Sequence, residues 1–216
     1  MKTTARIAPI VLAVTLAVAC RTASGPTTPQ IMQPGSPGQD TRTVSASQAS
    51  DLSKVRFTEA DVKFMQGMIG HHTQAIEMVD LLKTRTASDG MKKLALRIEV
   101  SQEDEIKMMQ EWLQNRRQAL PDPHAHHQGM LMPGMLTPEE MTRLGAAKGV
   151  EFDRLFLEGM IKHHGGAITM VQELFASPGA GQESDMFAFA SDVDADQRME
   201  IERMAAMLNA LNKEQE

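Results

Sequence analysis

The chain has 216 residues and a net charge of −6 at pH 7, with 22 basic and 28 acidic side chains. An acidic chain without a basic stripe argues against nucleic acid as a partner, and it mildly favours the attraction of cations. The single cysteine excludes an intramolecular disulfide bond.

Residues 1–19 are predicted to be a secretory signal peptide. Basic residues Lys2 and Arg6 precede an apolar run, residues 7–19, that is too short to span a membrane as a helix. Cys20 follows directly and resembles the lipidated cysteine of a bacterial lipoprotein, although Ala17 stands where leucine is usual. The alternative is ordinary signal cleavage nearby, which leaves a free thiol, a liability in an oxidising compartment. We therefore expect a protein of the periplasm or cell envelope, held at the membrane by its lipid anchor only.

Residues 20–55 are predicted to be a disordered tether that begins with the lipidated Cys20. The segment is rich in Ser, Thr, Pro, Gly and Gln and has few large apolar side chains. Such a composition cannot bury enough surface to offset the entropy lost on ordering. Residues 56–216 remain for one domain with a single core.

The first helix of the domain, predicted at 59–86, has a stripe of residues that recurs 92 positions later in a helix predicted at 150–176. Steps of three and four place each stripe on one face of its helix. A second histidine follows the first in both copies, as His72 and His164. The stripes are Asp61, Phe64, Met68, His71, Ala75, Met78 and Leu82, and Asp153, Phe156, Met160, His163, Ala167, Met170 and Leu174.

The helices that follow, predicted at 90–117 and 184–213, repeat each other at an offset of 95. Each helical hairpin leaves an apolar face uncovered, and stacking the two hairpins buries both faces. We therefore predict an all-α fold without a β-sheet, an antiparallel four-helix bundle made of hairpins at about 58–118 and 149–213. A short extra helix is expected at 138–147. Thr58, Ser88, Thr137 and Ser184 are the predicted helix caps.

The predicted register of each hairpin brings polar residues to the centre of the bundle. With Leu82 level with Met91, His71 faces Gln102 and Met68 faces Glu105. The second hairpin likewise sets His163 against Gln197 and Met160 against Glu200, with Met109 and Met204 one turn beyond the glutamates. Two interpretations stay open for this layer. It is either a metal site or a polar clasp that satisfies buried groups and fixes the packing register.

Residues 121–136 connect the hairpins and are rich in histidine and methionine. Proline and glycine keep the segment out of a regular helix, so its methionines have no core to fill. Imidazole and thioether groups suit copper as Cu(I) or Cu(II), whereas zinc usually recruits cysteine or acidic ligands and is less favoured. The candidate ligands here are His124, His126, His127, Met130, Met132 and Met135.

Several strings in the chain resemble domain-of-unknown-function family 305 over about residues 56–213. They are FMQGMIGHHTQAIEMV, FLEGMIKHHGGAITMV, QEDEI, QRMEI, and MPGM before TPEEM. The resemblance implies a secreted bacterial protein with a ferritin-like four-helix bundle, and copper binding linked to copper tolerance in some members. It implicates Met68, His71, His72, Met160, His163 and His164, with Gln102, Glu105, Gln197 and Glu200 beside them.

The favoured function is a non-enzymatic envelope protein that binds copper and buffers it or transfers it to a copper-handling envelope partner. A second possibility is an interaction module whose His/Glu/Gln layer is structural. A third, a ferritin-like oxidase, is disfavoured because Glu-x-x-His is absent and the core supplies only two carboxylates. The neighbours of the bundle ligands, or further ligands, are Gln102, Glu105, Met109, Gln197, Glu200 and Met204.

Overall fold

The computed structural model describes residues 31–33, 41–50, 55–121 and 131–214. The predicted signal peptide and Cys20 lie outside the described residues, as do His124, His126, His127 and Met130. No helix in the described part of the chain is long and apolar enough to cross a membrane.

The domain is helical, as predicted, and each expected helix is present. The four long helices are α2 (Glu59–Arg85), α3 (Asp89–Asn115), α5 (Gly149–Ala176) and α6 (Ser184–Lys213). The short helix α4 (Pro138–Ala146) lies in the connection between the hairpins. The all-α bundle fold is therefore confirmed.

Local capping explains why these helices begin where they do. Thr58 and Thr137 each form a reciprocal capping box with the carboxylate three residues later. The Ser88 side chain accepts a hydrogen bond from the backbone of Met91 at the start of α3. The prediction for Ser184 is wrong, because Glu183 is the capping residue of α6 and makes no side-chain cap bond.

The segment before the bundle contains short regular elements. Strand β1 (Ile31–Gln33) pairs antiparallel with β2 (Arg42–Val44), and a one-turn helix α1 (Ala46–Ala49) follows. Ser45 forms a capping box at the start of α1. The prediction of a disordered tether without a sheet is wrong for these residues, since the average composition of the segment hid the local β-branched and capping residues.

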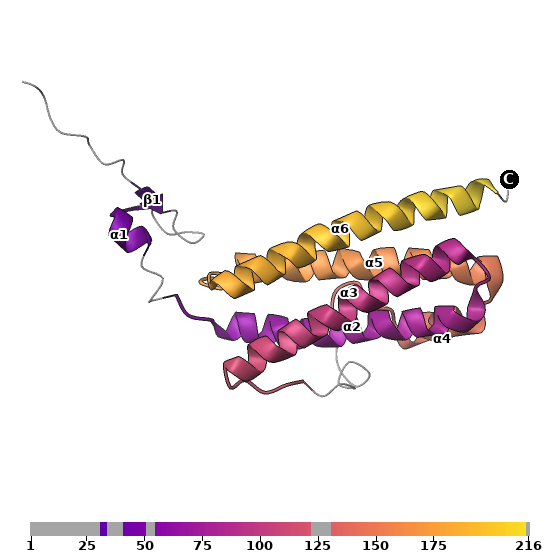
Figure 1. Cartoon of the computed structure of the whole chain (residues 1–216), viewed down its shortest axis with the longest axis horizontal. Coiled ribbons are helices and arrows are strands. Elements are labelled where there is room, and N and C mark those ends of the chain that lie inside the picture. The colour runs from indigo at the N-terminus through magenta and orange to yellow at the C-terminus, as the bar shows by residue number, and fades with distance from the viewer. Residues whose placement is uncertain (1–30, 34–40, 51–54, 122–130, 215–216) are drawn as a thin grey trace, which may run out of the picture.

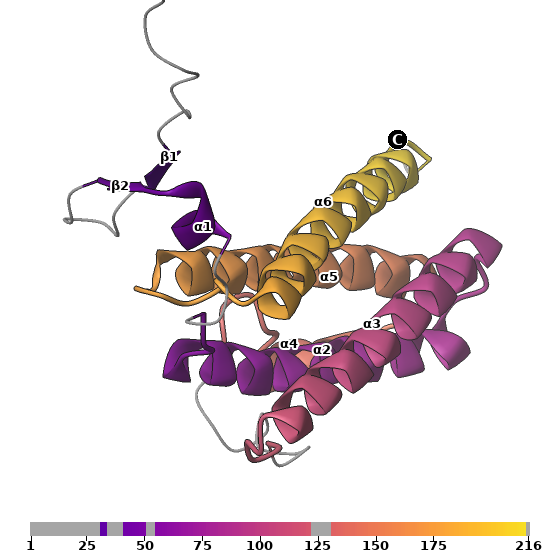
Figure 2. The ribbon, with the colours of Figure 1, turned by 60° about the vertical axis from the view of Figure 1, so that its left-hand side comes forward.

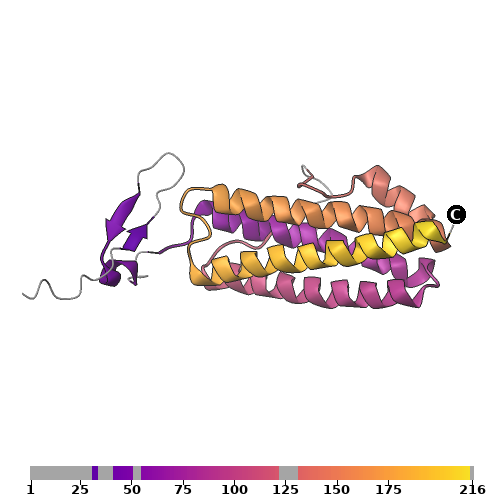
Figure 3. The ribbon, with the colours of Figure 1, turned by 90° about the horizontal axis from the view of Figure 1, so that it is seen from above.

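The two hairpins stack through α2 and α5, which lie side by side at the centre (Figure 1). Helix α3 packs on α2 and α6 packs on α5. Helices α3 and α6 are set apart from each other, and few of their residues are in contact (Figure 2). Helix α4 lies on the opposite side of the central pair from α3 and α6 (Figure 3). The turns of the two hairpins lie at opposite ends, so a pseudo-twofold axis passes through the middle of the bundle (Figure 1).

The core consists of two apolar clusters separated by a polar layer. One cluster includes Phe64, Met68, Met109 and Val193, and the other includes Met78, Ile98, Phe156, Met160 and Met204. The buried polar side chains between them come from all four long helices. They are His71, His72, Gln102, Glu105, His163, His164, Gln197 and Glu200.

Candidate metal centre

Four histidines of α2 and α5 meet at the middle of the bundle. The ring centroids of His71 and His163 are 3.8 Å apart, with an angle of 37° between the rings. The second histidine of each pair lies farther out, with centroids 6.3 Å apart for His71 and His72 and 6.1 Å apart for His163 and His164. None of the four is more than 1% exposed. The repeated stripe therefore places four imidazoles in a water-excluded layer.

The hydrogen bonds of the inner pair fix the tautomer of each ring. His71 Nε2 lies 3.0 Å from the carbonyl oxygen of Pro133, and His163 Nε2 lies 3.0 Å from the carbonyl oxygen of His71. Because a carbonyl oxygen only accepts, each Nε2 carries the proton and donates it. The Nδ1 atom of each neutral ring therefore holds a free lone pair.

Burial keeps the inner pair neutral. Desolvation, reinforced by the neighbouring His72 and His164, lowers the pKa of His71 from 6.5 to about 3, although the bond to Pro133 opposes this shift. Desolvation also lowers the pKa of His163 well below 6.5, with further contributions from His71, His164 and His72. Both rings are thus in the form that binds metal at neutral pH.

The outer pair is held by carboxylates of α3 and α6. His72 Nε2 lies 2.5 Å from Glu105 Oε2, and His164 Nε2 lies 2.7 Å from Glu200 Oε2. The glutamates were predicted to face Met68 and Met160, whereas their carboxylates reach the histidines four positions farther along α2 and α5. A carboxylate on the distal ring nitrogen is the usual way in which proteins orient a ligand imidazole.

All four rings share one feature. Among the described residues, no hydrogen-bond partner lies near the buried Nδ1 atoms of His71, His72, His163 and His164. The amide oxygens of Gln102 and Gln197 are likewise buried and unpartnered within the described residues. The prediction that these glutamines face His71 and His163 therefore finds no hydrogen bond to support it in this part of the chain.

Methionines flank the histidine layer on both sides. Met68 and Met160 lie one turn before the histidines and are fully buried, and so are Met109 and Met204. They belong to the two apolar clusters, so each fills core volume as well as placing a thioether near the layer.

The connecting segment, residues 131–137, is docked on the central helices. The Gln74 side chain donates to the carbonyl oxygen of Leu136 at 2.9 Å and accepts from its amide nitrogen at 2.8 Å. At Gly166, a Cβ atom would lie 1.9 Å from the carbonyl oxygen of Pro133, so only glycine admits the segment there. Gly134 follows with a φ of 75°, which glycine adopts without strain.

This docking corrects the expectation that the connection has no core to fill. Met135 is 3% exposed, and Met132 packs against the cluster that contains Met68. Because Pro133 also bonds His71, part of the predicted loop site and the bundle site are joined. Gln74 and Gly166 are 92 positions apart and are therefore equivalent positions of the repeat. The two copies differ here, with glutamine in one and glycine in the other, and this difference was the sequence signal for the docked segment.

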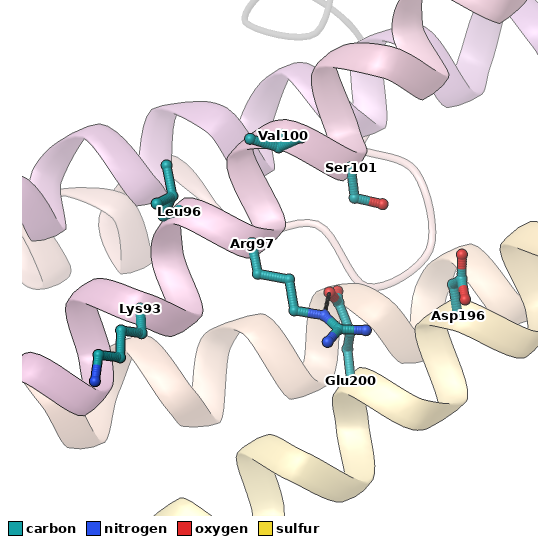
Figure 4. Close-up of a pocket in the computed structure, with 7 residues that line it drawn as sticks. All are labelled: Lys93, Leu96, Arg97, Val100, Ser101, Asp196 and Glu200. Atoms are coloured by element: carbon teal, nitrogen blue, oxygen red, sulfur yellow. Dashed lines mark ion pairs between the residues drawn. The ribbon is translucent and has the colours of Figure 1, made fainter.

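A groove between α3 and α6 leads to the outer pair. One part, of about 510 Å³, is lined by Arg97 and Glu200, whose Nε and Oε1 atoms are 3.7 Å apart across the groove (Figure 4). An adjoining part of about 480 Å³ is lined by Glu105 and several aspartates. Burial first, then the charges of Glu105 and Glu200, raise the pKa of Asp196 between them. Sequence reasoning missed this acidic groove, since it depends on the separation between α3 and α6.

The described residues do not contain a preformed site of the zinc type. No three His, Cys, Asp or Glu side chains in residues 31–33, 41–50, 55–121 and 131–214 lie close enough to hold one ion. The donors that the described layer offers are single imidazoles or pairs of them, with thioethers nearby. That donor set fits a soft ion such as Cu(I) better than zinc.

Residues 61–208 match the family described as Domain of unknown function (DUF305). The chain belongs to this family. Among solved structures, a DUF305 protein from Streptomyces coelicolor is 30% identical, with a TM-score of 0.61, covering 71% of this chain and 94% of that one. A DUF305 fragment from Deinococcus radiodurans is 28% identical, with a TM-score of 0.62, covering 71% and 98%.

A third similar structure is CopM in its Cu(I)-bound form. It is 28% identical, with a TM-score of 0.56, covering 72% of this chain and 98% of that chain. CopM has also been solved in Cu(II)-bound and Ag-bound forms, with TM-scores of 0.56 and 0.52. No curated protein matches the chain. The DUF305 bundle therefore includes structures that bind soft metal ions.

Proposed function

We propose that this protein binds copper in the cell envelope and buffers the ion or passes it on. The observation that carries the proposal is the set of four buried imidazoles that use Nε2 for protein contacts and leave Nδ1 unpartnered among the described residues. A buried ring nitrogen without a hydrogen bond is costly, and a metal ion would use its lone pair.

The proposed bundle ligands are His71, His72, His163 and His164, used no more than two at a time for one ion, together with the thioethers of Met68 and Met160. Glu105 and Glu200 orient the outer rings, and Met132 and Met135 bring two further thioethers from the docked segment. In this proposal the connection between the hairpins forms an adaptable site that captures copper before the ion reaches the bundle ligands. Its ligands are His124, His126, His127 and Met130. Similar structures with bound Cu(I), Cu(II) and Ag support copper as the cargo.

The groove between α3 and α6 supplies a route for the cation. Its carboxylates attract positive ions, and Glu105 and Glu200 lie at the boundary between the groove and the histidines. Envelope location rests on the signal-like N-terminus and the lipidation of Cys20. Comparing membrane fractions of wild type and Cys20→Ala tests that part, and an unchanged soluble distribution would contradict it.

The alternative function is a structural clasp between hairpins. Two observations favour it: each of the four bundle histidines already makes one hydrogen bond through Nε2, and no three-residue metal cluster is present in the described part of the chain. In that case the protein would act through its surface, and the unpartnered Nδ1 atoms would be a tolerated cost.

Replacing His124, His126 and His127 together with alanine is expected to remove part of the bound copper and leave the bundle intact. The reason is that these residues belong in sequence to the connection between α3 and α4, and the bundle histidines are unchanged in the variant. Copper analysis after equilibration, with circular dichroism and thermal unfolding of the same samples, measures both effects. Unchanged copper content would exclude the connection as a capture site, and lost helicity would contradict its independence from the core.

A further inference from the structure

The end of α6, the start of α5 and the turn between α2 and α3 lie together at one end of the bundle (Figure 3). Residues of these three segments line a pocket that the proposed copper function does not use. Its volume is about 370 Å³, within the range of small-molecule sites. Its walls are mostly apolar, and the described lining residues include no lysine or arginine. The residues that matter below are Met91, Gly149, Asp153, Leu157, Met207 and Glu214.

Asp153 is the buried polar side chain among the residues that line this pocket, and one of its carboxyl oxygens has no hydrogen-bond partner among the described residues. The residue is 5% exposed, and no hydrogen-bond partner for its Oδ1 atom lies among the described residues. Burial raises the pKa of this carboxyl, and a side-chain hydrogen bond with Thr86 acts in the opposite direction. A buried carboxyl oxygen without a donor is unfavourable, so a ligand that donates to it would stabilise the folded protein.

The pseudo-twofold axis shows what is missing at this end. Asp61, the equivalent of Asp153, accepts from the amide nitrogen of Gly181 at 2.7 Å and from the backbone nitrogen and hydroxyl of Thr58 at 2.6 and 2.8 Å. Both of its oxygens are therefore occupied. The repeat thus supplies an internal reference in which the same carboxyl is saturated with donors.

The empty volume of the pocket is also explained by comparing the two ends of the bundle. At the Asp61 end, Phe57 and Trp112 pack edge to face with ring centroids 5.6 Å apart. The repeat offsets of 92 and 95 place Gly149 and Met207 at the equivalent positions. A Cβ atom at Gly149 would meet nothing within 4 Å, so the space that an aromatic side chain fills at one end is open at the other.

We propose that this pocket binds a small arylalkylamine, with its ring between Met91, Leu157 and Met207 and its ammonium group donating to Asp153. The aromatic body follows from the Phe57–Trp112 pair that fills the equivalent space. The positive charge follows from Asp153 and from Glu214 in a lining that holds no lysine or arginine among the described residues. The site is distant in the fold from the histidine layer and does not depend on the copper proposal.

The test uses the metal-free full chain and 2-phenylethylamine as the probe, with 2-phenylethanol and 3-phenylpropionate as neutral and anionic controls. Methyl NMR of the methionines follows binding through Met91 and Met207. We expect saturable shifts at these methyls with the amine, and binding by the neutral and anionic controls that is weaker by about tenfold or more, because a charge-assisted bond is lost.

Two variants make the test decisive. Asp153→Asn keeps the shape of the side chain and is expected to weaken amine binding by about tenfold or more. Met207→Trp copies Trp112 of the other end and is expected to fill the pocket, abolish binding and raise the melting temperature. No saturable binding to wild type, or equal binding of amine and anion, would overturn the proposal. So would amine binding that survives Asp153→Asn and Met207→Trp in folded protein.

Discussion

Replacing Gly166 with alanine is expected to lower the free energy of unfolding by about 3 kcal/mol or more, combining a backbone clash with the loss of hydrogen bonds. The new Cβ atom would lie 1.9 Å from the carbonyl oxygen of Pro133, which is a rigid neighbour. The connecting segment must then move away from α5. That movement separates Pro133 from His71 and Leu136 from Gln74.

Gly165→Ala is the matched control for this change. A Cβ atom at Gly165 would meet nothing within 4 Å, and alanine is favoured over glycine in a helix by about 0.5–1 kcal/mol. Urea unfolding of the two variants should therefore shift in opposite directions from wild type. Equal stability of the two variants would show that the connecting segment does not dock at Gly166.

The metal-free protein is expected to lose stability as the pH falls from about 6.5 towards 3. In the unfolded chain, histidine protonates near pH 6.5, whereas in the fold burial lowers the pKa of His71 to about 3 and also lowers that of His163. The unfolded state therefore binds more protons throughout this window, so acid favours unfolding. Each such histidine contributes a slope of up to about 1.4 kcal/mol per pH unit.

Urea unfolding of the metal-free protein at a series of pH values measures this slope. The range above about pH 5 is the informative one, because unperturbed carboxyl groups titrate below it. The double variant His71→Gln, His163→Gln should show a flatter profile in that range, provided that circular dichroism shows it folded. A wild-type stability that is constant between about pH 7 and 5 would contradict the neutral, buried state of the two rings.

The heptad stripes were sufficient to predict the bundle and its polar layer. Steps of three and four place His71 and His163 on the buried faces of two helices, and matching hairpins leave stacking as the way to cover both apolar faces. The helix ends followed from local capping residues such as Thr58 and Thr137. These features depend on near neighbours in the sequence, which is why they can be predicted from it.

The contacts that depend on distant segments were predicted less well. Glu105 was expected to face Met68, but its carboxylate reaches His72, one turn farther along α2. The reason is that long side chains on a helix lean towards the N-terminus of that helix, so contacts between antiparallel helices do not follow the Cα register alone. The docking of residues 131–137 depends on the space at Gly166 and the hydrogen bonds of Gln74, which belong to different helices. The separation of α3 and α6, and hence the acidic groove, follows from the packing of each helix on its own hairpin partner.

Copper binding by the metal-free full chain tests the central claim most directly. Competition titrations with chromophoric chelators for Cu(I) and Cu(II), with zinc in parallel, should be carried out on wild type and on the folded His71→Gln, His163→Gln variant. We expect tight, saturable copper binding by wild type, weaker binding of zinc, and a clear loss of copper affinity in the variant. Copper affinity no higher than that of an unrelated histidine-containing bundle, unchanged by the two substitutions, would contradict the proposed function and leave the polar clasp as the role of the histidine layer.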